Sequence, residues 1–303
     1  MKNSIKITFI LITISLSILL VILPTSDKSS PTSNLPLYMA SHPHKESNDR
    51  ELDYFEPFYF NEAESISTDE VLRKWENKSL HSSEWGEHVS GVKNRLNTDD
   101  KVIALTFDAC GGTYGSGYDE ELISYLRSEE IPATLFFNTR WIKENKETFM
   151  ELSNDKLFTI ENHGTEHLPL SINGGTAWGI AATNSVSEVI EEVMGNQNLI
   201  TELTGKSPSY FRSGTAFYDD IAVQIVEDLG LTTVNFNILG DAGATFTSSQ
   251  VTNALVNATP GSIALLHMNR PESGTAAGVQ EAIPILIEKG YEFVHLTDYE
   301  LIE

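Results

Sequence analysis

Val102-Ile-Ala-Leu-Thr-Phe-Asp108 is an apolar run that ends on a carboxylate, and the same pattern returns along the rest of the chain. Farther on, Ser262-Ile-Ala-Leu-Leu ends at His267, and the β-like run 157–161 is followed by Asn162-His-Gly-Thr-Glu-His167. Short apolar runs bounded by turn residues predict buried strands. Since each polar group stands where a hydrophobic strand stops, we expect one functional site at the mouth of a barrel.

Strand-like and helix-like runs alternate after Asp100. Strands are expected at 102–107, 133–137, 157–161, 209–212, 232–238, 262–266 and 292–296. Helices are expected at 119–128, 143–153, 187–204, 219–229, 248–257 and 275–289. Alternation of this kind predicts right-handed βαβ units and a parallel sheet in an α/β domain. The number of strands favours a barrel, with a doubly wound open sheet as the alternative.

The sequence before this domain has a different character. Residues 1–24 carry Lys2 and Lys6 followed by an almost purely apolar run, which predicts a signal peptide or membrane anchor and therefore an exported protein. Residues 25–98 are rich in Ser, Pro, Asn, Asp and Glu, which predicts a low-complexity tether with one short helix at 68–80. The barrel domain is expected at 99–303.

Composition narrows the classes of partner. The chain has 20 Lys and Arg against 43 Asp and Glu, a net charge of -23, which argues against nucleic acid because phosphate binding needs clustered basic residues. We expect contact with a membrane only through the N-terminal segment. A single cysteine, Cys110, rules out a disulfide within the chain. The oligomeric state stays open.

Polar residues at the expected strand ends suggest a metal site with acid–base groups beside it. His163 and His167 stand four residues apart, and two neutral imidazoles suit zinc, with cobalt, nickel or manganese as alternatives. Asp108 is a candidate general base or metal carboxylate, and His267 is a candidate general acid. The partners expected to hold and orient these two groups are Arg212 and Asp241.

The motifs Thr106-Phe-Asp108, His163-x-x-x-His167, Phe211-Arg212 and Leu265-x-His267 together resemble the successive motifs of the polysaccharide deacetylases. This family is the NodB homology domain of carbohydrate esterase family four, and the resemblance covers roughly residues 101–297. It implies a distorted (β/α)7 barrel and metal-dependent removal of acetyl groups from an N- or O-acetylated polysaccharide of the cell wall or the extracellular space.

The resemblance also implies roles for individual residues. Asp108 would be the base, His163 and His167 would bind the metal, Arg212 would steady the base, and His267 would be the acid. A backbone N–H at Thr215 would hold the oxyanion. Exposed aromatic side chains near the same strand ends, Trp178 and Tyr218, are the candidates for contacting the sugar.

Two positions depart from the family pattern. The family reads Thr-Phe-Asp-Asp, with the second Asp as third metal ligand, and this chain has Ala109 there. The family's Arg-x-Pro-aromatic reads Arg212-Ser-Gly-Thr215. Catalytic zinc generally has three protein ligands, so we expect Asp108 to complete the set, with a Cys110 thiolate or water as alternatives.

Two other functions fit the same residues. The chain could be a catalytically silent relative that binds glycan and lost the metal with the change to Ala109. It could also be a metal-independent amidohydrolase that acts on a small amide. Retention of Asp108, both imidazoles and His267 favours the deacetylase, and metal content together with acetate release separates the three hypotheses.

Overall fold

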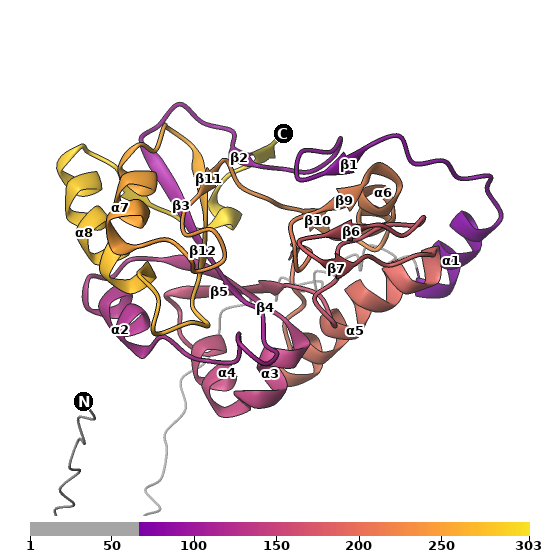
Figure 1. Cartoon of the computed structure of the whole chain (residues 1–303), viewed down its shortest axis with the longest axis horizontal. Helices are drawn as coiled ribbons and strands as arrows, with labels where there is room; N and C mark the ends of the chain where they lie inside the picture. Colours follow the sequence, from indigo (N-terminus) through magenta and orange to yellow (C-terminus); the bar gives the residue numbers. More distant parts are fainter. Residues whose placement is uncertain (1–66) are drawn as a thin grey trace, which may run out of the picture. The chain divides into compact units, whose positions relative to one another are not determined.

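The structure is a computed structural model and describes residues 67–303. Figure 1 shows the course of the chain. The expected signal peptide or anchor at 1–24 and the first part of the expected tether lie outside the described residues. Among the helices between residues 67 and 303, none is long and apolar enough to cross a membrane.

The described elements alternate as the sequence predicts. The parallel strands are β3 (Val102–Ala109), β4 (Ala133–Phe137), β5 (Phe158–Asn162), β8 (Tyr210–Phe211), β10 (Thr232–Thr233), β11 (Ile238–Leu239), β12 (Ser262–His267) and β13 (Glu292–Phe293). The helices are α1 (Thr68–Glu76), α2 (Glu120–Ser128), α3 (Thr139–Glu144), α4 (Lys146–Ser153), α5 (Val186–Thr204), α6 (Asp220–Asp228), α7 (Ser248–Val256), α8 (Thr275–Glu288) and the 3₁₀ turn η1 (Leu296–Asp298). The antiparallel strands are β1 (Trp85–Gly86), β2 (Arg95–Leu96), β6 (Thr176–Ala177), β7 (Ile180–Ala181), β9 (Tyr218–Asp219) and β14 (Leu301–Ile302).

The parallel strands form a curled sheet that confirms the α/β class and the distorted barrel. Their order is β10-β8-β5-β4-β3-β12-β11, so the ladder is interrupted between β10 and β11. The expected single strand 232–238 is therefore two short strands. The expected strand 292–296 is shorter too, because β13 pairs only with the start of β3, at Val102 and Ile103.

Side chains of β3 and β12 alternate between two buried layers. Ile103, Leu105 and Phe107 pack with the helix-side layer, whereas Val102 and Ala104 pack with the layer inside the sheet. Successive side chains of a strand point to opposite faces. Asp108 therefore shares the inner face with Ala104. By the same count on β12, where Ile263 and Leu265 are inner residues, His267 is inner as well.

The segment 67–98 corrects the expected tether, because it is folded onto the sheet. Ser67 caps α1, and Trp75 of α1 is buried and donates from Nε1 to the Asp228 carboxylate at 2.7 Å. Lys93 pairs with Val234 just after β10, while β2 pairs with β12. Figure 1 shows this segment running from α1 past β1 to β2. The segment thus pairs just after β10 and with β12, so it is part of the domain.

The expected helix 143–153 is also divided. Helix α3 ends at Glu144, and α4 begins at Lys146. The side-chain amide of Asn145 between them donates to the carbonyl oxygens of Ser116 and Trp141. Trp141 of α3 lies in the core, where its side chain is fully buried. The break is thus set by a side-chain hydrogen bond to a distant loop.

Candidate active site

The sheet register brings the two proposed proton-transfer residues together. Asp108 at the end of β3 and His267 at the end of β12 are direct partners in the parallel ladder. Both lie on the inner face of the sheet, and both line one cavity of about 410 Å³. Residues 159 positions apart in the chain are thus neighbours at the carboxyl end of the strands, where α/β barrels carry their sites.

Arg212 holds the carboxylate of Asp108. The guanidinium is fully buried, and its Nη1 donates to Asp108 Oδ1 at 2.8 Å and to Thr106 Oγ1 at 2.9 Å. Its remaining donors go to the carbonyl oxygens of Val234 and Asn235. Burial opposes ionisation of Asp108, but the positive charges of Arg212 and His267 and the hydrogen bond from Arg212 outweigh it, so the pKa of Asp108 lies below its ordinary value. Asp108 is therefore a carboxylate at neutral pH.

Asp241 raises the pKa of His267, whereas Arg212 lowers that of Asp108. Its Oδ1 lies 2.8 Å from Nδ1 of His267, and its Oδ2 accepts the His267 backbone N–H at 2.7 Å and the Thr275 hydroxyl at 2.9 Å. Burial alone lowers the pKa of an imidazole, but the Asp241 carboxylate outweighs it and raises the pKa of His267 well above the ordinary value. His267 is therefore protonated at neutral pH.

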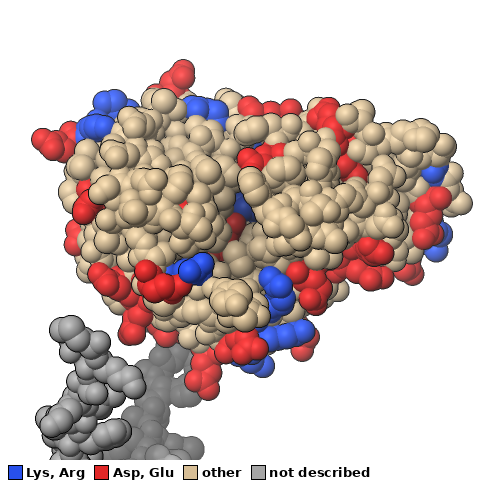
Figure 2. Space-filling view, viewed as in Figure 1, with Lys and Arg blue, Asp and Glu red and all other residues tan. Residues whose placement is uncertain are grey.

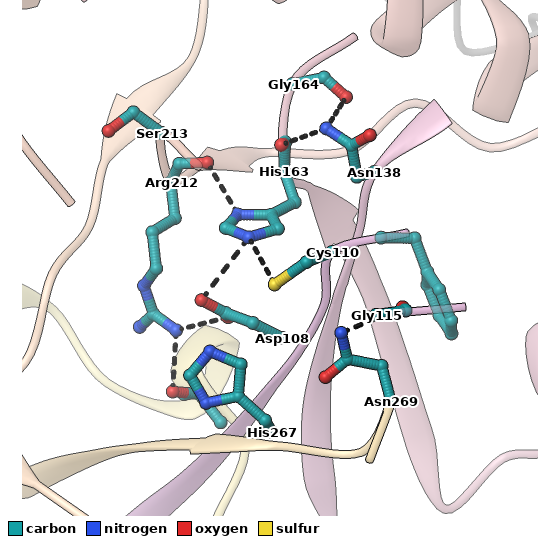
Figure 3. A network of polar contacts seen from close by, with 12 residues as sticks. Asp108, Cys110, Gly115, Asn138, His163, Gly164, Arg212, Ser213, His267 and Asn269 are labelled. Carbon is teal, nitrogen blue, oxygen red and sulfur yellow. Dashed lines mark hydrogen bonds and ion pairs between the residues drawn. The ribbon is translucent and has the colours of Figure 1, made fainter. Parts of the chain in front are cut away.

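The expected pair of imidazoles is brought together just after β5. The rings of His163 and His167 lie 5.0 Å apart and nearly perpendicular. Nδ1 of His163 lies 3.0 Å from the Arg212 carbonyl oxygen, to which it donates, so Nε2 carries the free lone pair. Figure 3 shows Asp108 and Cys110 both pointing at this Nε2, at 3.6 and 3.7 Å.

The loop that carries His167 is fixed by a buried carboxylate. Glu192 of α5 accepts the backbone N–H groups of Glu166 at 2.8 Å and of Leu168 at 3.0 Å. Burial raises the pKa of Glu192 to about 7. His167 itself has a positive φ of 65°, a conformation that a non-glycine residue adopts only when its surroundings impose it. Glu192 was not predicted, because a Glu within a helix gives no sign of what it faces.

The departure at Gly214 has a structural reason. A Cβ atom at this position would overlap the ring and the backbone of His167. Glycine therefore lets the 212–215 segment pass directly against the second imidazole, which a proline would prevent. The glycine in the altered Arg-Ser-Gly-Thr motif thus provides the space that His167 occupies in this chain.

Of the residues proposed to contact the sugar or its acetyl group, Trp178 and Thr215 line the cavity and Tyr218 does not. Trp178, on the β6–β7 turn, is 74% exposed and lines the cavity. Its ring packs against that of Phe217, with the ring centroids 5.8 Å apart. Thr215 lines the cavity too, and its buried hydroxyl has no partner within the described residues. Tyr218 corrects the prediction: it is fully buried, and its hydroxyl bonds to the Ser213 N–H and to Asn235, so it supports the wall from behind.

Two further residues belong to the site, one that the sequence missed and one that it named only as an alternative ligand. Glu87, from the segment taken for a tether, lines the cavity, and burial raises its pKa. Cys110, an alternative for the third metal ligand, has its sulfur 3.7 Å from Nε2 of His163 and near His167. Burial opposes ionisation of Cys110, but His167 and His267 outweigh it and lower the pKa of the thiol to about 6.

The chain carries more acidic than basic side chains, 43 against 20. Figure 2 shows Asp and Glu side chains around the edge of one face, with basic side chains scattered between them and a hollow near its middle. Such a field repels polyanions. A neutral glycan meets no such repulsion.

Comparison with known proteins agrees with the fold. Residues 95–234 match the family model "Polysaccharide deacetylase", a match that ends before Asp241 and His267. The uncharacterized protein YlxY of Bacillus subtilis (strain 168) is 21% identical over 203 residues, 67% of this chain and 58% of the relative. The chain therefore spans little more than half the length of that relative.

Solved structures share the architecture. A wild-type family 4 carbohydrate esterase (CE4) pseudoenzyme from Bacillus anthracis superimposes with a TM-score of 0.57 at 21% identity, covering 71% of this chain and 69% of that one. Bacillus subtilis PdaA, a family 4 carbohydrate esterase, gives a TM-score of 0.58 at 22% identity, covering 69% and 84%. At this level of identity, the likeness establishes the fold.

Proposed function

We propose that this chain, whose residues 95–234 belong to the polysaccharide deacetylase family, is an exported, metal-dependent hydrolase that removes acetyl groups from an N- or O-acetylated polysaccharide. The observation that carries the proposal is the arrangement of Asp108 and His267. They lie side by side in one cavity, and their buried partners hold them in opposite protonation states. A carboxylate that accepts a proton beside an imidazolium that donates one is what hydrolysis of an amide or ester needs.

The residues divide the reaction between them. Asp108 accepts a proton from the water that attacks the acetyl carbonyl carbon. Thr215 lies in the cavity wall, and its backbone N–H is the group we expect to donate to the oxygen as it gains negative charge. His267 then gives its proton to the leaving nitrogen or oxygen of the sugar, and the C–N or C–O bond breaks. The products are acetate and a free amine or hydroxyl.

The imidazoles fit a divalent metal ion. Nε2 of His163 carries a free lone pair, and Nε2 of His167 is buried without a partner in the described part of the chain. A buried polar atom left without a partner is costly unless something binds it. When bound, a divalent ion would polarise the acetyl carbonyl and lower the pKa of a coordinated water. Zinc is our first choice, with cobalt, nickel and manganese as alternatives.

The cavity supports an acetylated sugar as substrate. Its wall combines Trp178 and Phe236 with the polar groups of Glu87 and Thr215, and sugar rings are bound by stacking on aromatic faces with polar groups around them. The apolar segment within residues 1–24 supports export, which would bring the protein to cell-wall or extracellular glycan. Cleavage or retention of that segment is left open.

A second candidate is a silent glycan-binding protein. Ala109 stands where the family has a ligand Asp, and one protein of similar fold is described as a pseudoenzyme. This candidate requires the cavity to bind sugar without turnover. It gains support if the purified chain holds no metal and releases no acetate.

Acetate release by the purified full-length protein tests the proposal. The substrates are N-acetylated chitooligosaccharide, O-acetylated xylan and peptidoglycan, each with and without added zinc. We expect release from at least one substrate, lost on chelation and lost in Asp108→Asn. Activity that survives chelation would favour the metal-independent amidohydrolase, and sugar binding without release would favour the silent relative.

Export is tested separately. Fractionation of cells that produce the full chain is expected to place it outside the cytoplasm. Deletion of residues 1–24 should retain it in the cytoplasm. Cytoplasmic location of the full chain would contradict this part of the proposal.

A further inference from the structure

The end of β3 carries a sulfur atom beside the two imidazoles. Within residues 67–303, Cys110, His163 and His167 form a group whose ligand atoms all lie within 4.8 Å of one another. Sγ of Cys110 lies 3.7 Å from Nε2 of His163. Three donors this close can bind a single ion after small adjustments, because zinc bonds to nitrogen and sulfur are about 2.0–2.3 Å long.

One ring nitrogen of each histidine is available to bind a metal ion. The Nδ1–H of His163 is used by the Arg212 carbonyl, which leaves Nε2 directed at Cys110. A histidine that donates one ring N–H to a carbonyl while the other nitrogen faces a metal is the usual arrangement in metal sites. Nε2 of His167 is buried and without a partner among the described residues. Nε2 of each histidine is thus available to bind a metal ion, and a third protein ligand is still needed.

Asp108, the third ligand expected from the sequence, is held by Arg212. Its Oδ1 accepts from Arg212 at 2.8 Å, and its Oδ2 lies 3.6 Å from Nε2 of His163, but Asp108 does not belong to the group whose ligand atoms all lie within 4.8 Å of one another. Ala109, where the family carries its ligand Asp, is fully buried in the helix-side layer with Phe107. Neither position 108 nor position 109 therefore supplies the missing donor as the chain stands.

We propose that the thiolate of Cys110 is the third metal ligand and replaces the carboxylate that the family places at position 109. This inference rests on the proposed function only in that it concerns the same metal. On binding, the Cys110 S–H bond breaks, its proton leaves to solvent, and a metal–sulfur bond forms. A His₂Cys site with an open position retains three protein ligands, as catalytic zinc requires.

The thiolate determines which metal the site selects. Soft sulfur ligands favour zinc, whereas magnesium and manganese prefer oxygen. A carboxylate at the same place would accept manganese more readily. We therefore expect this chain to bind zinc or cobalt and to discriminate against magnesium and manganese.

The test uses the full-length protein loaded with Co²⁺. Since Cys110 is the only cysteine in the chain, any sulfur-to-cobalt charge-transfer band in the near ultraviolet comes from this residue. We expect one ion per chain and such a band in the wild type. Zinc should also protect the thiol from alkylation by iodoacetamide, and chelation should remove the protection.

Two variants and one control complete the experiment. Cys110→Ser should lose the band and bind zinc more weakly by more than about 100-fold, the upper end of what loss of an outer hydrogen-bond partner costs. Cys110→Asp should lose the band but bind manganese relatively better than the wild type. Thr113→Ala, an exposed change in the same loop, should keep the band and the affinity.

The outcomes separate this inference from the deacetylase function. If the wild type lacks the band, binds no metal, or binds zinc no better than Cys110→Ser does, Cys110 is not a ligand, whatever acetate release is measured. If the band and the affinity loss are observed but no substrate releases acetate, the thiolate site stands and the proposed function fails.

Discussion

The base and acid sides of the cavity are built from the same kinds of group in opposite order. On the base side the carboxylate of Asp108 faces the cavity and its cation, Arg212, is buried behind it. On the acid side the imidazole of His267 faces the cavity and its carboxylate, Asp241, is buried behind it. In each pair the buried partner fixes the protonation state of the group that meets the substrate, so the pKa values of the two are driven apart.

Removal of the buried cation should have the largest effect. Arg212→Ala leaves the Asp108 carboxylate buried and unpaired, which is expected to cost about 3–5 kcal/mol in the free energy of unfolding. Urea denaturation measures this cost. If the variant folds, the pKa of Asp108 rises and the acidic limb of kcat/KM moves to higher pH. A variant as stable as the wild type would show that the ion pair between Arg212 and Asp108 does not stabilise the fold.

Neutralising the groups that face the cavity should lower turnover while the chain still folds, although each change also costs stability, because Arg212 or Asp241 then stays buried without its counter-charge. Asp108→Asn and His267→Ala are each expected to lower kcat by about 100-fold or more, because each removes a proton-transfer group. Acetate release and thermal unfolding are measured on the same preparations. Undiminished release in both variants would remove these residues from the mechanism.

Glu161 shows what a buried carboxylate does without a cation. Burial raises its pKa to about 8, although Oε2 accepts the Ser209 and Tyr210 N–H groups. The pKa of Glu161 is higher in the folded state than in the unfolded state. Its contribution to the free energy of unfolding is therefore fully present below the unfolded-state pKa and is lost as the pH rises toward about 8. Relative to Glu161→Gln, the wild type should lose about 1.4 kcal/mol for each pH unit across this window. A pH-independent difference in unfolding free energy would show that Glu161 stays ionised in the folded state.

On the acid side, Asp241→Asn keeps the shape but removes the charge. The pKa of His267 should fall, so the alkaline limb of kcat/KM moves to lower pH, and kcat/KM above the limb drops roughly tenfold for each pH unit by which the limb moves. Thr275→Val is the matched control, because it removes one hydrogen bond to Asp241 and keeps the carboxylate. Equal pH profiles in wild type and Asp241→Asn would exclude Asp241 as the group that charges His267.

The smallest effect is expected at the cavity wall, away from both pairs. Trp178→Ala should raise KM for an oligosaccharide by about threefold to tenfold with little change in kcat, as expected for loss of one aromatic contact. Tyr114→Ala is the control, since Tyr114 is 85% exposed and is not among the residues that line the cavity. Equal KM values for both variants would place the sugar elsewhere.

The sequence alone determined the fold class and most of the elements, because short continuous apolar runs and helical amphipathic runs indicate which residues are buried. It also identified Asp108, His163, His167 and His267, since polar groups at the carboxyl ends of parallel strands converge whatever the details. The α/β class, the strands β3, β4 and β12 and the long helix α5 required no tertiary information.

Only the tertiary structure decided what surrounds those residues. The segment 67–98 is polar enough to read as a tether, and it is folded because Trp75 and short strand pairings bury it against the domain. Tyr218 faces the core, Glu192 holds the loop of His167, and the Cys110 sulfur faces both imidazoles. Side-chain direction at the end of a strand depends on packing from distant segments, and no local pattern of residues encodes it.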